Sequence, residues 1–228
     1  MNERRSLSVY LLLIVWCLIA LFAGRIMLSR GVPLRLFDGE ALAVVCLGFF
    51  AVPYQQLAGL PSLTDYRVNW RLRYLAPFAM GLSFAIVDVV VFRYVLHPAP
   101  SSRLPGFLQP FPYSALYFVA DAVYVEVIYR LLPFTLILSL TGHLQLKAGR
   151  TPIAFWIVAI VTSLAAPYQL IVKGPVQLMV TLYTLHFVFN MIQALFYKNA
   201  GLLASLCMRL GHYLLWYILL GICLQWKF

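Results

Sequence analysis

The chain consists largely of apolar runs of about 20 residues, separated by short segments that contain proline, glycine or charged residues. A helix needs about 20 consecutive apolar residues to cross the hydrocarbon core of a bilayer, where irregular backbone cannot be exposed to lipid. The sequence therefore predicts an all-α polytopic membrane protein with about seven transmembrane helices. The predicted spans are Ser8–Leu28, Glu40–Leu60, Tyr74–Leu96, Tyr113–Leu140, Pro152–Val172, Val176–Tyr197 and Gly201–Leu224.

The composition excludes an ordinary soluble domain. Of the 228 residues, 63% are hydrophobic and 11% are charged, whereas soluble domains average about 45–50% and about 25%. We expect one integral membrane unit. In this unit residues 1–112 form the N-terminal transmembrane helices with their loops, and residues 113–228 form a core of the remaining helices.

The net charge of +10 comes from basic residues that are scattered singly through loops and helix ends. Nucleic-acid-binding proteins gather such residues in clusters, so we expect no nucleic-acid partner and assign the excess to topology and to anionic membrane lipids. With the N-terminus in the cytoplasm, the positive-inside rule is obeyed, and the short loops are typical of a protein of the bacterial inner membrane. The inner basic residues are then Arg4, Arg5, Arg67, Arg71, Arg73, Lys147, Arg150 and Lys198, against Arg30, Arg35, Arg103, Lys173 and Lys227 outside.

Two charged residues, Glu126 and Arg130, lie four positions apart within the apolar run Tyr113–Leu140. A charged side chain at the centre of a transmembrane helix costs about 2.5–3.5 kcal/mol on insertion scales, so such residues are paired or functional. Residues at positions i and i+4 project from one side of a helix. We therefore predict that Glu126 and Arg130 neutralise each other.

Further polar residues at membrane depth belong to other predicted helices. Arg25 and Arg93 lie near the ends of spans, and we expect their side chains to extend to the interface. Asp88 is expected to pair either with Arg93 or with a basic group on another helix. The whole set comprises Arg25, Asp88, Arg93, Asp121, Glu126, Arg130, His186, Asn190, Arg209 and His212.

The spacing of the histidines suggests chemistry. His186 and Asn190 share one face of the sixth predicted span, and His212 shares a face of the seventh with Arg209. A buried carboxylate near histidines from other helices can activate a water molecule as a general base, or it can bind a metal ion. Because no H-E-x-x-H or comparable ligand spacing is present, we predict neither a metal site nor a cofactor. The alternative is a structural network of hydrogen bonds between helices.

Three segments of the C-terminal half carry a family resemblance. They are Val125–Arg130, Thr162–Gln169, and Tyr197–His212, in which a loop and a helix rich in small residues lead to a histidine. From about Tyr113 to Leu224 the chain resembles the CPBP family of intramembrane endopeptidases, which includes CAAX proteases and bacteriocin-processing enzymes. The resemblance implies a CAAX-protease-like helix bundle whose active site is built from the motifs E-E-x-x-x-R, F-x-x-x-H and H-x-x-x-N.

Several catalytic positions implied by the resemblance hold other residues. Val125 replaces the glutamate that activates the attacking water, Tyr168 or Gln169 replaces the histidine of the second motif, and Trp216 replaces the asparagine that steadies the oxyanion. Loss of a general base typically costs about 10²–10⁴-fold in rate, and loss of an oxyanion donor about 10²–10³-fold. We therefore expect a pseudoenzyme that no longer cuts. The catalytic positions that match are Glu126, Arg130 and His212.

Two features allow a shifted active site instead. Asp121 lies one turn before Val125 on the same helix face, so its carboxylate can reach the water site. The segment His186–Asn190 spells H-x-x-x-N, outside the position of the third motif. For both features the alternative is hydrogen bonding between helices.

The sequence thus predicts a membrane scaffold or regulator. It would bind a membrane-protein partner, a membrane-embedded peptide or a lipid-linked substrate in the former active-site cleft. One alternative is an active intramembrane endopeptidase with a shifted site, which uses Asp121 or Glu126 together with His212 or His186. A small transporter or lipid-handling protein is a further alternative, which the lack of a visible internal inverted repeat disfavours.

Overall fold

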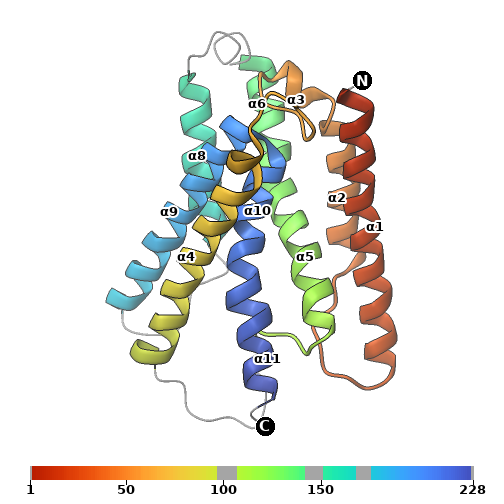
Figure 1. Ribbon diagram of the computed structural model, residues 1–228, viewed down its shortest axis with the longest axis vertical. Helices are drawn as coiled ribbons and strands as arrows, with labels where there is room; N and C mark the ends of the chain where they lie inside the picture. Colours follow the sequence, from red (N-terminus) through yellow and green to blue (C-terminus); the bar gives the residue numbers. More distant parts are fainter. Residues whose placement is uncertain (1, 97–106, 142–150, 168–175, 227–228) are drawn as a thin grey trace.

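The computed structural model describes residues 2–96, 107–141, 151–167 and 176–226 of the chain. In these ranges every regular element is helical and no strand is present. The long helices pack side by side along one axis, and the chain starts and finishes at opposite ends of the bundle (Figure 1). In chain order, with π-helical segments marked η, the elements are α1 (Asn2–Ser29), α2 (Gly39–Ala51), α3 (Tyr54–Leu57), η1 (Arg71–Leu75), α4 (Ala76–Val91), η2 (Phe92–Leu96), α5 (Tyr113–Glu126), η3 (Val127–Leu131), α6 (Leu132–Thr141), α8 (Ile153–Ala165), α9 (Val176–Ala200), α10 (Leu202–Tyr213), η5 (Leu214–Leu219) and α11 (Leu220–Gln225).

Within the described ranges, 5 helices are long and apolar enough to cross a membrane, so the chain is a helical integral membrane protein. The prediction of about seven spans is not confirmed, because the second and fifth predicted spans contain helices of 13 residues each, α2 and α8. At 1.5 Å per residue such a helix is about 20 Å long, shorter than the hydrocarbon core of about 30 Å. The long helices are Glu3–Ser29, Arg71–Val95, Tyr113–Thr141, Val176–Ala200 and Leu202–Gln225.

Local signals explain why α2 is short. Asp38 caps its first turn, because Asp38 Oδ1 accepts a hydrogen bond from the backbone N–H of Ala41 at 2.8 Å. Pro53 follows the last residues of the helix and has no N–H with which to continue the hydrogen-bond pattern. Beyond it α3 spans only 4 residues, and Gly59 then takes up a left-handed backbone with φ 78°. The predicted span Glu40–Leu60 is therefore broken in the middle.

The third long helix contains a π-helical segment in its centre: α5 is followed directly by η3, which is followed by α6. Pro133 lies just after this segment and has no N–H to give to the carbonyl of Tyr129, four residues before it. That carbonyl accepts a hydrogen bond from Arg130 Nη1 at 3.0 Å. The side chain of Arg130 therefore supplies the hydrogen bond that the Tyr129 carbonyl would otherwise lack at membrane depth.

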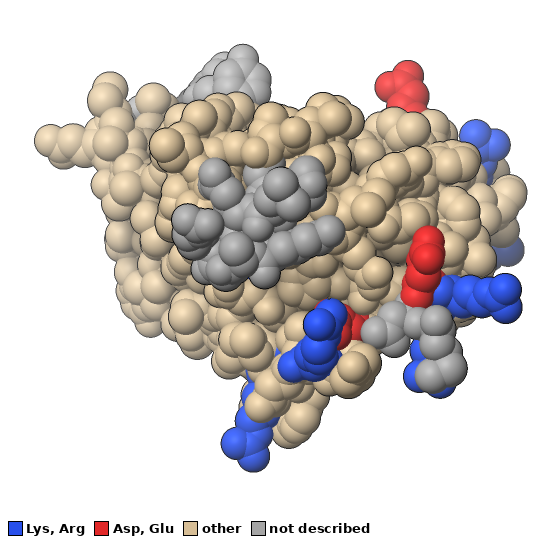
Figure 2. Space-filling view, turned by 90° about the horizontal axis from the view of Figure 1, so that it is seen from above, with Lys and Arg blue, Asp and Glu red and all other residues tan. Residues whose placement is uncertain are grey.

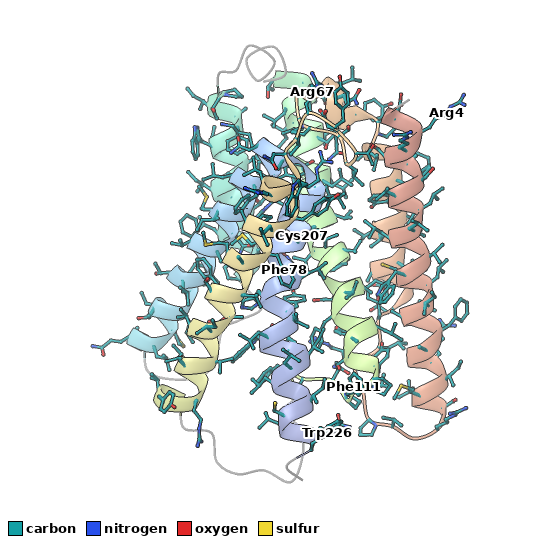
Figure 3. The ribbon with its side chains drawn as sticks, in the orientation of Figure 1. Arg4, Arg67, Phe78, Phe111, Cys207 and Trp226 are labelled. Carbon is teal, nitrogen blue, oxygen red and sulfur yellow. The ribbon has the colours of Figure 1, made fainter. Side chains whose placement is uncertain are left out.

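Two glycines bring α4 and α10 close together. A Cβ atom added at Gly81 of α4 would overlap the carbonyl oxygen of Met208, and one added at Gly211 of α10 would overlap that of Phe78. Small residues allow such backbone approach between membrane helices, where dispersion forces replace the hydrophobic effect. Figure 3 shows Phe78 and Cys207 where the two helices pack. Helix α4, from the N-terminal part, thus belongs to the same bundle as the C-terminal helices.

Charged side chains lie mainly toward the two ends of the bundle. Arg4 and Arg67 lie at the end of the bundle where the chain begins (Figure 3). Two aromatic residues, Phe111 and Trp226, mark the opposite end in the same figure. Seen from the first end, Lys, Arg, Asp and Glu side chains follow part of the rim, and the other described residues in view are uncharged (Figure 2). Arg25 and Arg93 are both exposed, as expected of side chains that extend to the interface.

Replacement of Gly81 by alanine should destabilise the protein, because a methyl group forces the backbone of α4 away from Met208. Overpacking of this kind typically costs about 1–3 kcal/mol. We expect a lower thermal unfolding midpoint in detergent for Gly81→Ala. The matched control is Gly39→Ala, since a Cβ atom at Gly39 meets nothing within 4 Å; an equal loss in both variants would contradict the close contact.

Candidate functional site

A buried ion pair joins α5 to α10. Arg209 Nε lies 2.6 Å from Glu126 Oε1, and the two side chains are 8% and 1% exposed. The predicted neutralisation of Glu126 by Arg130 is therefore wrong, since the carboxylate takes its ion-pair partner from another helix. Helix α10 brings Arg209 to the carboxylate from across the bundle, whereas the guanidinium of Arg130 extends toward α8 and α9.

Arg130 is completely buried and binds groups on both of these helices. Its Nη2 donates to the carbonyl oxygen of Asn190 at 2.6 Å, and its Nη1 donates to the hydroxyl of Thr162 at 3.0 Å. Together with the bond to its neighbour Tyr129, these contacts tie η3 to α8 and α9. The position of Arg130 is thus that of a cross-link between helices.

Two amides of α9 complete the arrangement. Gln193 Nε2 donates to Glu126 Oε1 at 2.9 Å, and Gln193 Oε1 accepts from Arg209 Nη2 at 2.7 Å. Asn190 Oδ1 accepts from Arg209 Nη2 at 3.1 Å and from Arg130 Nη2 at 3.3 Å. We call Glu126, Arg130, Asn190, Gln193 and Arg209 the ion-pair network. The sequence analysis did not single out Gln193, although its position seven residues after His186 places it on the same helix face.

A second cluster is formed by Asp88 of α4, His186 of α9 and His212 of α10. Asp88 Oδ2 lies 2.7 Å from His212 Nε2 and 3.4 Å from His186 Nε2. Of the two partners predicted for Asp88, a basic group on another helix is the one observed, while Arg93 is exposed. The structure therefore joins two histidines that the sequence offered as alternatives.

A cavity of about 560 Å³ adjoins both groups of residues. Val125 lines this cavity, whereas Glu126 and Arg130 are absent from its lining among the described residues. The polar residues of the predicted site thus divide between the cavity wall and the packed interior behind it. Those that line the cavity are Asp121, His186, Asn190, Arg209 and His212.

The remaining predicted positions lie apart from the two clusters. Asp121 Oδ2 accepts a hydrogen bond from the hydroxyl of Tyr213 at 3.1 Å. The ring of Trp216 stacks on that of Phe107, with centroids 5.6 Å apart. The second-motif candidates, at positions 168 and 169, lie outside the described residues.

Aromatic rings, small and aliphatic side chains, and charged groups of both signs make up the rest of the cavity wall. The Arg35 guanidinium lies 4.9 Å from the centroid of the Tyr117 ring, and that of Arg209 lies 5.7 Å from the Phe189 ring. Phe118 stacks on Tyr217 with centroids 4.4 Å apart. Polar and apolar surface contribute about equally to this wall, so the cavity can bind a molecule that has both apolar and polar groups.

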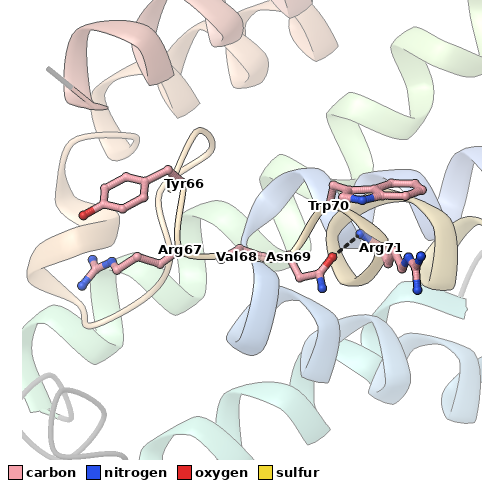
Figure 4. A pocket seen from close by; sticks show the side chains of 6 residues that line it. All are labelled: Tyr66, Arg67, Val68, Asn69, Trp70 and Arg71. Atoms are coloured by element: carbon pink, nitrogen blue, oxygen red, sulfur yellow. Dashed lines mark hydrogen bonds between the residues drawn. The ribbon is translucent and has the colours of Figure 1, made fainter.

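A second hollow, of about 610 Å³, lies on the surface and is lined by the contiguous segment Tyr66–Arg71 (Figure 4). There Asn69 Oδ1 accepts the backbone N–H of Arg71 at 2.9 Å. Desolvation acts to raise the pKa of the adjacent Asp65, but the hydrogen bonds and charge of Arg67 outweigh it and lower that pKa below its ordinary value. These contacts shape a loop in which Asp65 and Arg73 are buried, and Arg73 Nη2 donates to the carbonyl oxygen of Asp65 at 2.6 Å.

Comparisons with protein-family models, with curated proteins and with solved structures find no match to this chain. The resemblance to the CPBP family therefore rests on the motif residues of the sequence alone.

A double-mutant cycle distinguishes the two possible partners of Glu126. Arg209→Met alone leaves a carboxylate buried without its cation, and we expect it to lower the free energy of unfolding by about 3–5 kcal/mol. Adding Glu126→Gln should recover part of this loss, with a coupling of about 1 kcal/mol or more. Unfolding in mixed detergent micelles measures both values. The parallel cycle of Arg130→Met with Glu126→Gln is the control, and a larger coupling there would refute the assignment.

Proposed function

We propose that this chain is a CPBP-like membrane protein that binds a membrane-embedded peptide segment or a lipid-linked chain in its cavity without cutting it. The observation that carries this proposal is the division between Val125 and Glu126. Val125 lines the cavity at the position that matches the family's water-activating glutamate. Glu126, the glutamate that is present, lies behind the wall in an ion pair.

The chemistry of this arrangement supports binding over turnover. Valine cannot take a proton from water. The Glu126 carboxylate already accepts hydrogen bonds from Arg209 and Gln193 through one oxygen, and Glu126 is not among the described residues that line the cavity. Since general-base catalysis supplies about 10²–10⁴-fold in rate, a chain with valine at the position of the family's water-activating glutamate turns over slowly at best by the family mechanism.

The size and lining of the cavity suit such a ligand. Its volume of about 560 Å³ falls within the range of about 300–1,000 Å³ found for ligand sites. Rings of Phe118, Phe189 and Tyr217 offer apolar surface to a lipid or peptide side chain, while Arg35 and Arg209 offer donors to a polar or anionic group. Both kinds of contact are present in a lipid-linked chain and in a membrane-embedded peptide.

Photo-crosslinking tests the proposal. A benzophenone amino acid replaces Tyr124, which lines the cavity, and the protein is irradiated in native membranes. We expect one discrete crosslinked product of defined mass, in which the bound molecule is uncut. The matched control carries the same amino acid in place of Phe50, another aromatic residue, whose side chain is 68% exposed. Identical diffuse labelling from both positions would overturn the proposal.

An active endopeptidase with a shifted site is the second candidate. It is favoured by Asp88 Oδ2, which lies 2.7 Å from His212 Nε2 and can orient that imidazole as a base, as a carboxylate does in catalytic triads. In the same crosslinking experiment, this candidate predicts a product that contains a cleaved ligand. Loss of the cleavage in His212→Ala, with the ligand still crosslinked, would favour this candidate over the first.

We further propose that the end of the bundle at which the chain begins faces the cytoplasm of a bacterial inner membrane. Arg4 and Arg67 lie at that end (Figure 3), in agreement with the positive-inside rule. Arg67, whose side chain is 75% exposed, serves as a probe. In a cysteine-free background, a membrane-impermeant thiol reagent should label Arg67→Cys in inverted vesicles and not in intact cells. Labelling in intact cells would reverse the orientation.

A further inference from the structure

Three side chains with metal-binding atoms converge at the cavity wall from three helices, α4, α9 and α10. Asp88, His186 and His212 each offer one ligand atom, and these atoms all lie within 4.8 Å of one another. Asp88 and His212 are buried, at 5% and 4% exposure, and both histidines line the cavity. The cluster is therefore enclosed by protein on one side and adjoins the cavity on the other.

The hydrogen bonds of His186 define which of its ring nitrogens faces the cluster. His186 Nδ1 lies 2.9 Å from the carbonyl oxygen of Leu182. Because a carbonyl oxygen only accepts, Nδ1 carries the hydrogen, and in a neutral ring Nε2 then presents a lone pair. That lone pair faces Asp88 Oδ2 at 3.4 Å. The lone pair of His186 Nε2 and the oxygen of Asp88 are both acceptors and repel each other. Either a second proton on the His186 ring or a cation between the two atoms removes this repulsion.

The charge of Asp88 points to a cation as well. Its Oδ1 is buried and has no hydrogen-bond partner among the described residues. The buried guanidinium of Arg209 is already paired with Glu126, and Arg93 is exposed. A carboxylate buried with so few donors costs several kcal/mol unless positive charge compensates it.

We propose that Asp88, His186 and His212 bind one divalent first-row metal ion, such as Zn²⁺, with a further coordination position directed at the cavity. Two imidazoles and one carboxylate are a donor set that such ions favour in sites with an open position. Ligand atoms at about 2.0–2.2 Å from an ion lie about 3–3.6 Å apart. The distances from Asp88 Oδ2 to the two histidine nitrogens, 2.7 Å and 3.4 Å, lie within a few tenths of an ångström of that range. The ligand atoms of the two histidines lie within 4.8 Å of each other, and the side chains close around the ion when it binds.

For His186 the surroundings provide the support that metal-binding histidines use, whereas His212 Nδ1 has no hydrogen-bond partner among the described residues. Such a histidine usually donates its other ring N–H to a carbonyl or carboxylate, which fixes its orientation. The bond from His186 Nδ1 to Leu182 is of this kind. On the open side, an ion would take an anionic or carbonyl oxygen of a molecule in the cavity. This inference goes beyond the proposed function, because it requires neither a partner nor the family resemblance.

The test uses the full-length chain, purified in detergent with a tag that contains no histidines and stripped by a chelator. Titration with Zn²⁺ should show one tight equivalent by isothermal calorimetry, and Co²⁺ should give visible absorption of a low-symmetry site with nitrogen ligands. Zn²⁺ should also raise the thermal unfolding midpoint, since it binds the folded state. A wild-type chain without saturable one-to-one binding of either ion would overturn the proposal.

Variants locate the ion. Asp88→Asn, which preserves shape, and His186→Gln should each weaken binding at least tenfold and change the Co²⁺ spectrum. The control is His143→Ala, at a histidine outside the described residues, which should bind as the wild type does. Unchanged affinity in both cluster variants would place any bound metal elsewhere and overturn the proposal.

Discussion

The cost of burying charge in a medium of low dielectric is the constraint on which the rest of this structure depends. Glu126 and Arg209 are both buried at membrane depth, and each meets the other across the bundle at 2.6 Å. The amide of Gln193 bonds to both partners. Since neither charge can be left unpaired, α5, α9 and α10 are held in one register, and Arg130 extends the same network to α8.

Close backbone packing gives α10 a second role. Gly81 and Gly211 let α4 approach it, which brings the carboxylate of Asp88 to 2.7 Å from His212. Arg209 and His212 are three residues apart, so one face of α10 serves both the ion-pair network and the histidine cluster. Helix α10 thus connects the ion-pair network behind the cavity wall to the histidine cluster on the wall.

The two groups differ in what they can do chemically. In the network, Glu126 is buried in an ion pair with Arg209 and does not line the cavity, which suits a structural role. Two atoms of the network, Glu126 Oε2 and Arg130 Nε, have no hydrogen-bond partner among the described residues. The histidine cluster adjoins the cavity, and one oxygen of Asp88 has no partner among the described residues, which suits the binding of a cation. The cavity wall carries Val125 at the position that the resemblance matches to the family's base, and the proposal of a binding function depends on that match.

The sequence by itself determined the class of the protein and most of its long helices, because about 20 apolar residues in a row leave a bilayer helix as the outcome. It also selected the residues of both clusters except Gln193, since charge at membrane depth is rare. Only the tertiary structure decided the partners: Glu126 meets Arg209, 83 positions away, and Asp88 meets His212, 124 positions away. Helical periodicity fixes the direction in which a side chain leaves its own helix, and it contains no information on which helix lies opposite. That choice depends on packing between distant segments, which here is set by glycine contacts and by the requirement that buried charges be paired.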